Sequence, residues 1–277
     1  MLTMFVSIPS PSSGSLELGP LTLNAYGAMI AIGVIVAVSV GGRRLEARGS
    51  GTRDDMSAVA MWGVPAGVIG ARVYHVITDW DRFSGNLGDA IKIWKGGLGI
   101  WGGIFLGTIV GVMVARRRGL RAADVLTAVA PGLAFAQAIG RWGNWFNQEL
   151  FGRATTLPWA LSVSDDTAIK AGFEPGTTFH PTFLYESLLC AALGFGLIAL
   201  DKRVPMRPGR LFAFYVAGYT AFRFFVEGLR IDPAHYAGGL RLNQWVSVVV
   251  FACAVVVIVA MRGAPAVPEQ VAQEPAD

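Results

Sequence analysis

Long apolar runs, each about as long as a bilayer is thick, limit this chain to very few folds. Seven such segments lie at residues 21–42, 56–77, 98–115, 123–142, 181–200, 209–227 and 244–261. About 20 apolar residues in helical conformation span the hydrocarbon core of a membrane. The sequence therefore predicts an all-α integral membrane protein, built as a bundle of seven transmembrane helices.

Composition excludes a soluble protein. Hydrophobic residues make up 53% of the 277-residue chain and charged residues only 15%, against about a quarter in soluble domains. The net charge of +4 is modest, and nothing indicates a nucleic-acid surface. Cys190 and Cys253 fall inside apolar runs without metal or disulfide spacing, so we expect both to be small buried side chains and predict no metal and no cofactor.

Basic residues predict the orientation of the chain. The loops after the first, third and fifth segments each carry four Arg or Lys residues, whereas those in the opposite loops are more dispersed. Short basic loops stay in the cytoplasm, so the N-terminus should lie outside and the C-terminus inside. We expect an N-terminal surface arm (1–20), a membrane domain (21–262) and a disordered cytoplasmic tail (263–277). A small extracytoplasmic head should lie between the fourth and fifth spans, within residues 140–180.

Residues 140–153 (GRWGNWFNQELFGR) place Arg141, Asn144 and Glu149 at the outer end of an apolar run. Charges at such depth are costly and usually mark a functional site. The predicted orientation brings more polar residues to the same side, among them Tyr26, Arg72, Trp101, Glu186, Arg223 and Glu227. An arginine fork fits phosphate oxygens. We therefore expect a polar cavity in the outer half of the membrane that binds a phospholipid.

Several of these residues have plainer interpretations. Arg223 and Glu227 are one helical turn apart and can neutralise each other. Tyr26 and Trp101 can be aromatic residues of the membrane interface, and Glu186 can pair with Arg72. His75 and His180 fit structural roles better than proton transfer. Glycines recur every four residues at 63 and 67 and from 99 to 111, which predicts closely packed helices.

The chain resembles the prolipoprotein diacylglyceryl transferases. The resemblance rests on residues 140–153 and on further motifs in family order: LGPLTLNAYG (18–27), GARVYH (70–75), GGLGIWGG (96–103), HPTFLYE (180–186) and RFFVEGLR (223–230). It implies a bacterial cytoplasmic (inner) membrane enzyme that transfers diacylglyceryl from phosphatidylglycerol to the lipobox cysteine of a prolipoprotein signal peptide, forming a thioether and releasing glycerol phosphate.

The resemblance also implies the roles of residues. Arg141, Arg223, Glu227 and Tyr26 would be catalytic. The substrates would be bound by Asn144, Glu149, Gly152, Trp101, Arg72 and Glu186. Many family members have a histidine at the position of Trp101, and it has been proposed as the base, so a histidine-base mechanism does not transfer to this chain. Either another group takes the thiol proton, or the thiol ionises against the cationic pocket.

Two other functions remain open on the residues alone. A different phospholipid headgroup transferase would need the same outer cavity, and only its acceptor would differ. A transporter is less favoured, because it would show inverted repeats or polar residues through the full membrane depth. No repeat is visible, and the ionisable groups stop halfway.

Overall fold

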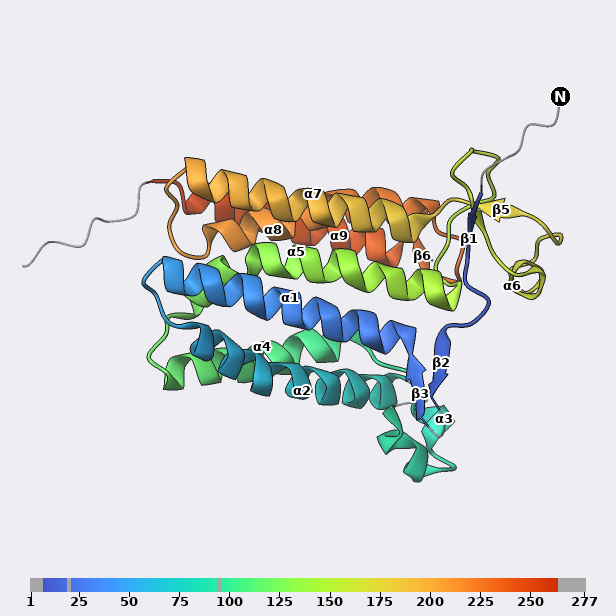
Figure 1. Ribbon diagram of the computed structural model, residues 1–277, viewed down its shortest axis with the longest axis horizontal. Coiled ribbons are helices and arrows are strands. Elements are labelled where there is room, and N and C mark those ends of the chain that lie inside the picture. Colours follow the sequence, from blue (N-terminus) through green and yellow to red (C-terminus); the bar gives the residue numbers. More distant parts are fainter. Residues whose placement is uncertain (1–6, 19–20, 94–95, 264–277) are drawn as a thin grey trace, which may run out of the picture. The chain divides into compact units, whose positions relative to one another are not determined.

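The computed structural model describes residues 7–18, 21–93 and 96–263 (Figure 1). Its long helices are α1 (Ala25–Ala47), α2 (Arg53–Thr78), α4 (Ile100–Arg117), α5 (Ala122–Asn147), α7 (Thr182–Arg203), α8 (Arg210–Leu229) and α9 (Leu242–Ala260). Shorter helices are α3 (Trp80–Phe83), η1 (Leu87–Ile91) and α6 (Asp165–Lys170). The strands are β1 (Ile8–Pro9), β2 (Ser15–Leu18), β3 (Leu21–Asn24), β4 (Leu161–Ser162), β5 (Thr178–Phe179), β6 (Tyr236–Ala237) and β7 (Leu240–Arg241).

Six of the long helices, all except α8, are long and apolar enough to cross a membrane. Their surfaces expose many large apolar side chains, such as Ile35, Phe105 and Phe195, which suit lipid rather than water. The prediction of a helical membrane protein is therefore confirmed. The short strands were not predicted, and α8 carries enough polar residues to fall outside the six.

The helix boundaries follow the predicted apolar segments with two informative differences. The first helix begins at Ala25 rather than at residue 21, because Leu21–Asn24 pairs with β2 and the Asn24 side chain accepts a hydrogen bond from the Tyr26 N–H at 2.8 Å. Helix α5 continues five residues beyond the predicted end, to Asn147. This extension places residues 143–147 of the polar motif on the helix, and the rest of the motif follows in a turn.

The chain forms two compact units, one of which is Val34–Gly132. Within it α2 and α4 pack backbone against backbone. A Cβ atom added to Gly70 would lie 2.3 Å from the Gly102 carbonyl oxygen, and one added to Gly102 would lie 2.2 Å from the Gly70 carbonyl oxygen. Gly63 and Gly67 face Gly107 and its neighbours in the same way. The close packing predicted from the glycine spacing is confirmed.

The other unit comprises Met1–Gly33 and Leu133–Asp277. In it α8 packs against both α7 and α9 (Figure 1). Residues 148–181, which we call the head, join α5 to α7 and contain α6, β4 and β5. The core of the head consists of Phe151, Leu161, Val163, Ala168 and Phe179, together with Phe183 of α7.

The N-terminal residues join the head. Strand β1 pairs in parallel with β4, giving the strand order β1-β4-β5. The Trp145 indole N–H donates to the Pro9 carbonyl oxygen at 3.1 Å, and the Gln148 amide donates to the Pro11 carbonyl oxygen at 2.7 Å. Of the predicted surface arm, residues 1–6 and 19–20 lie outside the described residues, as does the predicted disordered tail from residue 264 onward.

The two cysteines differ in burial. Cys190 on α7 is fully buried, as predicted, whereas Cys253 on α9 is exposed, so the prediction for Cys253 was wrong. An apolar run does not distinguish a helix face that packs inward from one that faces lipid, because both faces are apolar in a membrane protein.

Candidate active site

The polar end of α5 lies opposite α7. Arg141 lies near the C-terminal end of α5. Its Nε forms an ion pair with a carboxylate oxygen of Glu186 on α7. Glu186 is only 2% exposed. A carboxylate that is buried so deeply needs a cation to offset its lost hydration, and Arg141 supplies the first.

Arg223 on α8 supplies the second. One of its terminal nitrogens pairs with the other oxygen of Glu186, and its second terminal nitrogen pairs with Glu227 one turn further along α8. Arg223 therefore joins two carboxylates from two helices. The neutralisation of Arg223 by Glu227 expected from their spacing is present, but it forms only one link in a longer chain of ion pairs.

Glu227 is the most buried member of this chain, with no exposed surface. Besides Arg223, it receives Arg230 at 3.5 Å and the Nε of Arg241 at 3.1 Å. The Asn243 amide donates to it at 3.2 Å. Arg230 and Arg241 come from the segment that connects α8 to α9, and both are mostly buried, so three cations surround one carboxylate.

Asp232 completes this end of the cluster. It accepts from the Arg230 Nε at 2.7 Å and from a terminal nitrogen of Arg241 at 2.9 Å. Burial raises the pKa of the Asp232 carboxyl, but hydrogen bonds and charge from the two arginines outweigh burial and hold the pKa below its usual value. Asp232 is therefore ionised at neutral pH and anchors both guanidinium groups.

The signature residues form a second hydrogen-bonded group next to Arg141. The Asn144 amide donates to a Glu149 carboxylate oxygen at 2.8 Å, and the Asn147 amide lies 3.5 Å from the same atom. The turn after α5 makes this contact possible, because Gln148 and Leu150 adopt left-handed backbone angles, with φ of 51° and 59°. Such angles are rare outside glycine and often occur at functional sites.

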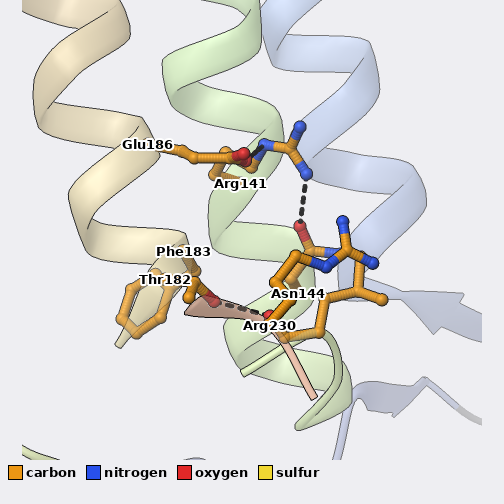
Figure 2. A pocket seen from close by; sticks show the side chains of 7 residues that line it. Arg141, Asn144, Thr182, Phe183, Glu186 and Arg230 are labelled. Carbon is orange, nitrogen blue, oxygen red and sulfur yellow. Dashed lines mark hydrogen bonds and ion pairs between the residues drawn. The ribbon is translucent and has the colours of Figure 1, made fainter. Parts of the chain in front are cut away.

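A small cavity opens among these groups. It is lined by Arg141, Asn144, Leu150, Thr182, Phe183, Glu186 and Arg230. Figure 2 shows Arg141 between the Glu186 carboxylate and the Asn144 side chain, with Arg230 on the opposite side of Asn144. About 10 Å³ is open to the centre of a water molecule, which is room for roughly one water.

Arg141 is held firmly on one side only. Its Nε is paired with Glu186, but its terminal nitrogens lie 3.4 Å from the Asn144 Oδ1 and 3.4 Å from the Tyr219 hydroxyl. Hydrogen bonds of that length are weak. The outer edge of this guanidinium is therefore available to an incoming anion.

Two further predicted residues, Tyr26 and Gly152, are closely packed against their neighbours. The Tyr26 ring of α1 packs against Gly143, where an added Cβ would lie 2.3 Å from the ring. Gly152 donates its N–H to the His180 carbonyl oxygen at 2.9 Å and forms a bridge with Arg230. A Cβ on Gly152 would meet the Cβ of His180 at 2.8 Å, so glycine is needed there for the chain's own packing.

His180 itself makes a structural contact. Its Nδ1 lies 3.1 Å from the Tyr185 hydroxyl, which also accepts a hydrogen bond from the Trp159 indole N–H at 3.1 Å. Burial lowers the pKa of the His180 imidazole, and the charge of Arg153 lowers it further. His180 is therefore neutral at physiological pH.

Arg72 and Trp101 belong to the other unit, Val34–Gly132. The Arg72 guanidinium donates to the carbonyl oxygens of four residues between α3 and α4, namely Asp89, Ala90, Gly96 and Gly97. Glu186, which the sequence allowed as a partner of Arg72, pairs with Arg141 and Arg223. Trp101, near the start of α4, is 47% exposed.

Five residues of the cluster were missed by the sequence reasoning: Tyr219, Arg230, Asp232, Arg241 and Asn243. Arg230 was within reach, because it ends the motif that contains Arg223 and Glu227. Arg241 had no signal, since it belongs to the short β6–β7 hairpin, which the sequence did not predict. In the part of the chain that the structure describes, no three His, Cys, Asp or Glu side chains gather as metal ligands would.

Comparison with known proteins agrees with the sequence motifs. A family model for prolipoprotein diacylglyceryl transferase matches residues 14–260. The phosphatidylglycerol–prolipoprotein diacylglyceryl transferase of Streptomyces griseus is 51% identical over 255 residues, which cover 91% of this chain and 77% of that protein. The protein of the same name from Cutibacterium acnes is 48% identical over 260 residues, which cover 93% of this chain and 87% of that protein.

Proposed function

Because the chain belongs to the prolipoprotein diacylglyceryl transferase family, we propose that it transfers the diacylglyceryl group of phosphatidylglycerol to the lipobox cysteine of prolipoproteins. The observation that carries this proposal is the chain of buried ion pairs from Arg141 through Glu186 and Arg223 to Glu227, which borders a cavity. A cavity lined by arginine suits an anionic headgroup.

The reaction breaks a carbon–oxygen bond and forms a carbon–sulfur bond. The cysteine sulfur attacks the glyceryl carbon that carries the phosphate, and glycerol phosphate leaves with the bonding electron pair and, in the overall balance, with the thiol proton. The nucleophile belongs to the acceptor, so the enzyme has to stabilise a thiolate and a departing phosphate. Fixed cations in a site that excludes water do both.

Arg141 and Arg223 are the groups we assign to this stabilisation. The weakly held terminal nitrogens of Arg141 can turn from Asn144 and Tyr219 to phosphate oxygens while Nε stays paired with Glu186. Glu186 and Glu227 keep both guanidinium groups in place, and Glu227 takes part in the catalytic cluster through Arg223. The guanidinium charges also stabilise the thiolate form of the cysteine. Trp101 has no basic group, so it cannot take the thiol proton.

The remaining predicted residues receive binding roles. Asn144 and Glu149 would hold the glycerol hydroxyls, and Tyr26 would contact the headgroup from its place against Gly143. Gly152 would keep the turn close to Arg230. Arg72 fits a structural role better, because its donors are taken by loop carbonyls, while Trp101 is exposed enough to contact a lipid.

The cavity is smaller than the headgroup that it would have to bind. Its open volume suits about one water molecule, whereas a glycerol phosphate headgroup is several times larger. Arg230 borders the cavity and is held by Asp232, whose side chain is 26% exposed, and only distantly by Glu227. We propose that the headgroup enters by displacing the Arg230 and Arg141 side chains, which then contact it.

We also propose the membrane arrangement that these roles need. Helix α8 would be a seventh span, with its polar residues turned to α7 and α9 rather than to lipid. The N-terminus and the head would lie outside the bacterial cytoplasmic membrane, and the C-terminus inside, as the basic loops require. The head, the site and the signal peptide of the acceptor would then share one side of the membrane.

The test is direct. Purified protein would be given phosphatidylglycerol and a lipobox peptide, and the diacylglyceryl adduct would be measured by mass. We expect an adduct with the cysteine peptide and none with its serine counterpart. Absence of any adduct, or modification of a different acceptor only, would overturn the proposal.

A further inference from the structure

A buried polar atom on α5 has no partner. The side-chain oxygen of Gln137, Oε1, is buried and accepts no hydrogen bond within residues 7–18, 21–93 and 96–263. The Gln137 side chain does hydrogen-bond with the buried Tyr215 on α8, so the amide nitrogen makes that bond. An amide oxygen left unpaired in the interior costs free energy and calls for an explanation.

Gln137 lies on the same face of α5 as the candidate active site. Gln137, Arg141 and Asn144 are spaced by four and three residues, so their side chains lie one above the other. At 1.5 Å per residue, Gln137 is about 6 Å further from the head than Arg141. Tyr219 connects the two levels, because its hydroxyl lies 3.4 Å from Arg141 and its ring stacks on Tyr215 with 6.4 Å between centroids. A neutral layer of Gln137, Tyr215 and Tyr219 therefore adjoins the charged layer.

Open space adjoins this face at Gly140. Gly140 follows Gln137 by three residues, so the two are neighbours on the helix surface. A Cβ atom added to Gly140 would meet nothing within 4 Å. The next turn of α5 is closely packed, since a Cβ atom added to Gly143 would lie 2.3 Å from the Tyr26 ring. A ligand that extends from Arg141 along α5 therefore finds room at Gly140, beside Gln137.

The two layers match the two polar parts of a diacyl phospholipid. The phosphate is anionic and suits the guanidinium group of Arg141. The ester groups follow the phosphate within a few bonds, on the side of the acyl chains. They are neutral, and they accept hydrogen bonds but donate none. A neutral donor one helical turn beyond Arg141 therefore complements an ester carbonyl.

The Gln137 amide supplies such a donor when it turns over. Rotation about its last bond brings Oε1 to the Tyr215 hydroxyl, which then donates to it. The N–H bonds of the amide are thereby freed for a carbonyl oxygen of the ligand. In this arrangement the amide oxygen and the amide nitrogen both have partners, which removes the cost of the unpaired oxygen.

We propose that Gln137, positioned by Tyr215, donates a hydrogen bond to an ester carbonyl of the phospholipid donor, and that this contact makes the protein select donors with ester-linked chains. The proposal rests on the proposed function. It adds a contact for donor specificity that lies outside the chain of ion pairs.

The test is a competition between two phosphatidylglycerols of equal chain length, one with two ester-linked chains and the other with two ether-linked chains. The ether lipid lacks both carbonyl oxygens. Purified protein would receive a lipobox peptide and an equal mixture of the two lipids, and both adducts would be measured by mass. Their ratio is the ratio of kcat/KM and does not depend on the fraction of folded protein. For the parent we expect about tenfold more diester adduct, the size of one neutral hydrogen bond.

Gln137→Leu should bring the adduct ratio close to unity, because it removes the donor. Tyr215→Phe should lower the ratio in part, because it keeps the amide but removes the hydroxyl that orients it. Thr220→Val is the matched control on α8, since the buried Thr220 hydroxyl donates to the Val216 carbonyl oxygen of its own helix at 2.8 Å. It should keep the preference of the parent.

Three outcomes would overturn the ester contact: equal adducts in the parent, an unchanged ratio in Gln137→Leu, or the same loss of preference in Thr220→Val. Absence of an adduct from either lipid in the parent would instead overturn the proposed function itself.

Discussion

The two compact units hold their helices together in opposite ways. In Val34–Gly132, α2 and α4 approach until the carbonyl oxygen of Gly70 lies only 2.2 Å from where a Cβ of Gly102 would be. In the other unit, α5, α7 and α8 are joined by Arg141, Glu186, Arg223 and Glu227. The first interface depends on missing side chains, and the second depends on long charged ones.

The difference shows what each unit can do. Backbone packing gains close contact without any polar group to satisfy, so it gives a rigid support and no chemistry. Buried ion pairs are rarely the most stable solution, because desolvation offsets much of their attraction. A cluster of this kind that borders a cavity is therefore better explained by function than by stability.

The largest effect is expected from a substitution at the centre of the charged interface. Glu227→Gln would leave three buried arginines without their shared carboxylate, and removal of one partner of a buried pair costs about 3–5 kcal/mol. Thermal unfolding of the purified variant would show a large loss of stability relative to the parent. Glu46→Gln is the control, because Glu46 forms an exposed pair with Arg53 at 2.6 Å and should cost less than about 1 kcal/mol. Equal losses would show that the cluster does not hold the helices together.

The next effect is on catalysis. Arg141→Ala should lower kcat by about 10²–10³-fold, since loss of one preorganised donor has that size. Arg72→Ala, in the other unit, should lower the melting temperature instead, because it releases four loop carbonyls, and the folded fraction should keep most of its kcat. Adduct formation per folded protein measures both. A similar kcat loss in the two variants would remove the distinction between the units.

A smaller effect tests the glycine interface. Gly102→Ala would force a Cβ against the Gly70 carbonyl oxygen at 2.2 Å, and overpacking of this kind costs about 1–3 kcal/mol. Gly111→Ala, on the same helix, would place its Cβ 3.6 Å from a Val59 methyl group and should be close to neutral. Unfolding curves of the two variants measure the difference. If both variants were as stable as the parent, the close backbone contact between α2 and α4 would not limit the size of the side chain at Gly102.

The sequence predicted the two units unequally. The helices and the glycine interface followed from apolar length and from a four-residue spacing, both of which are local patterns. The motif residues Arg141, Asn144, Glu149, Arg223 and Glu227 were also found, and the structure brings them together.

The partners within the cluster were beyond the sequence. Glu186 was a candidate partner of Arg72, but it pairs with Arg141 and Arg223, since only packing decides which arginine reaches a carboxylate. Arg241 reaches Glu227 because the β6–β7 turn folds back to α8. The left-handed turn at Gln148 was equally hidden, because nothing about glutamine predicts a positive φ.

The smallest effect is the pH dependence that Asp232 gives to the charged unit. Arg230 and Arg241 keep the pKa of Asp232 below its usual value despite burial. The unfolded chain therefore binds a proton at a higher pH than the folded protein, and stability from Asp232 is complete above its unfolded pKa and is lost as pH falls through the folded one. The melting temperature of the parent should fall more between pH 5 and pH 3 than that of Asp232→Asn, which has no proton to bind. Parallel declines in the two proteins would mean that other carboxylates control acid stability, and that Asp232 anchors the arginines through hydrogen bonds rather than through its charge.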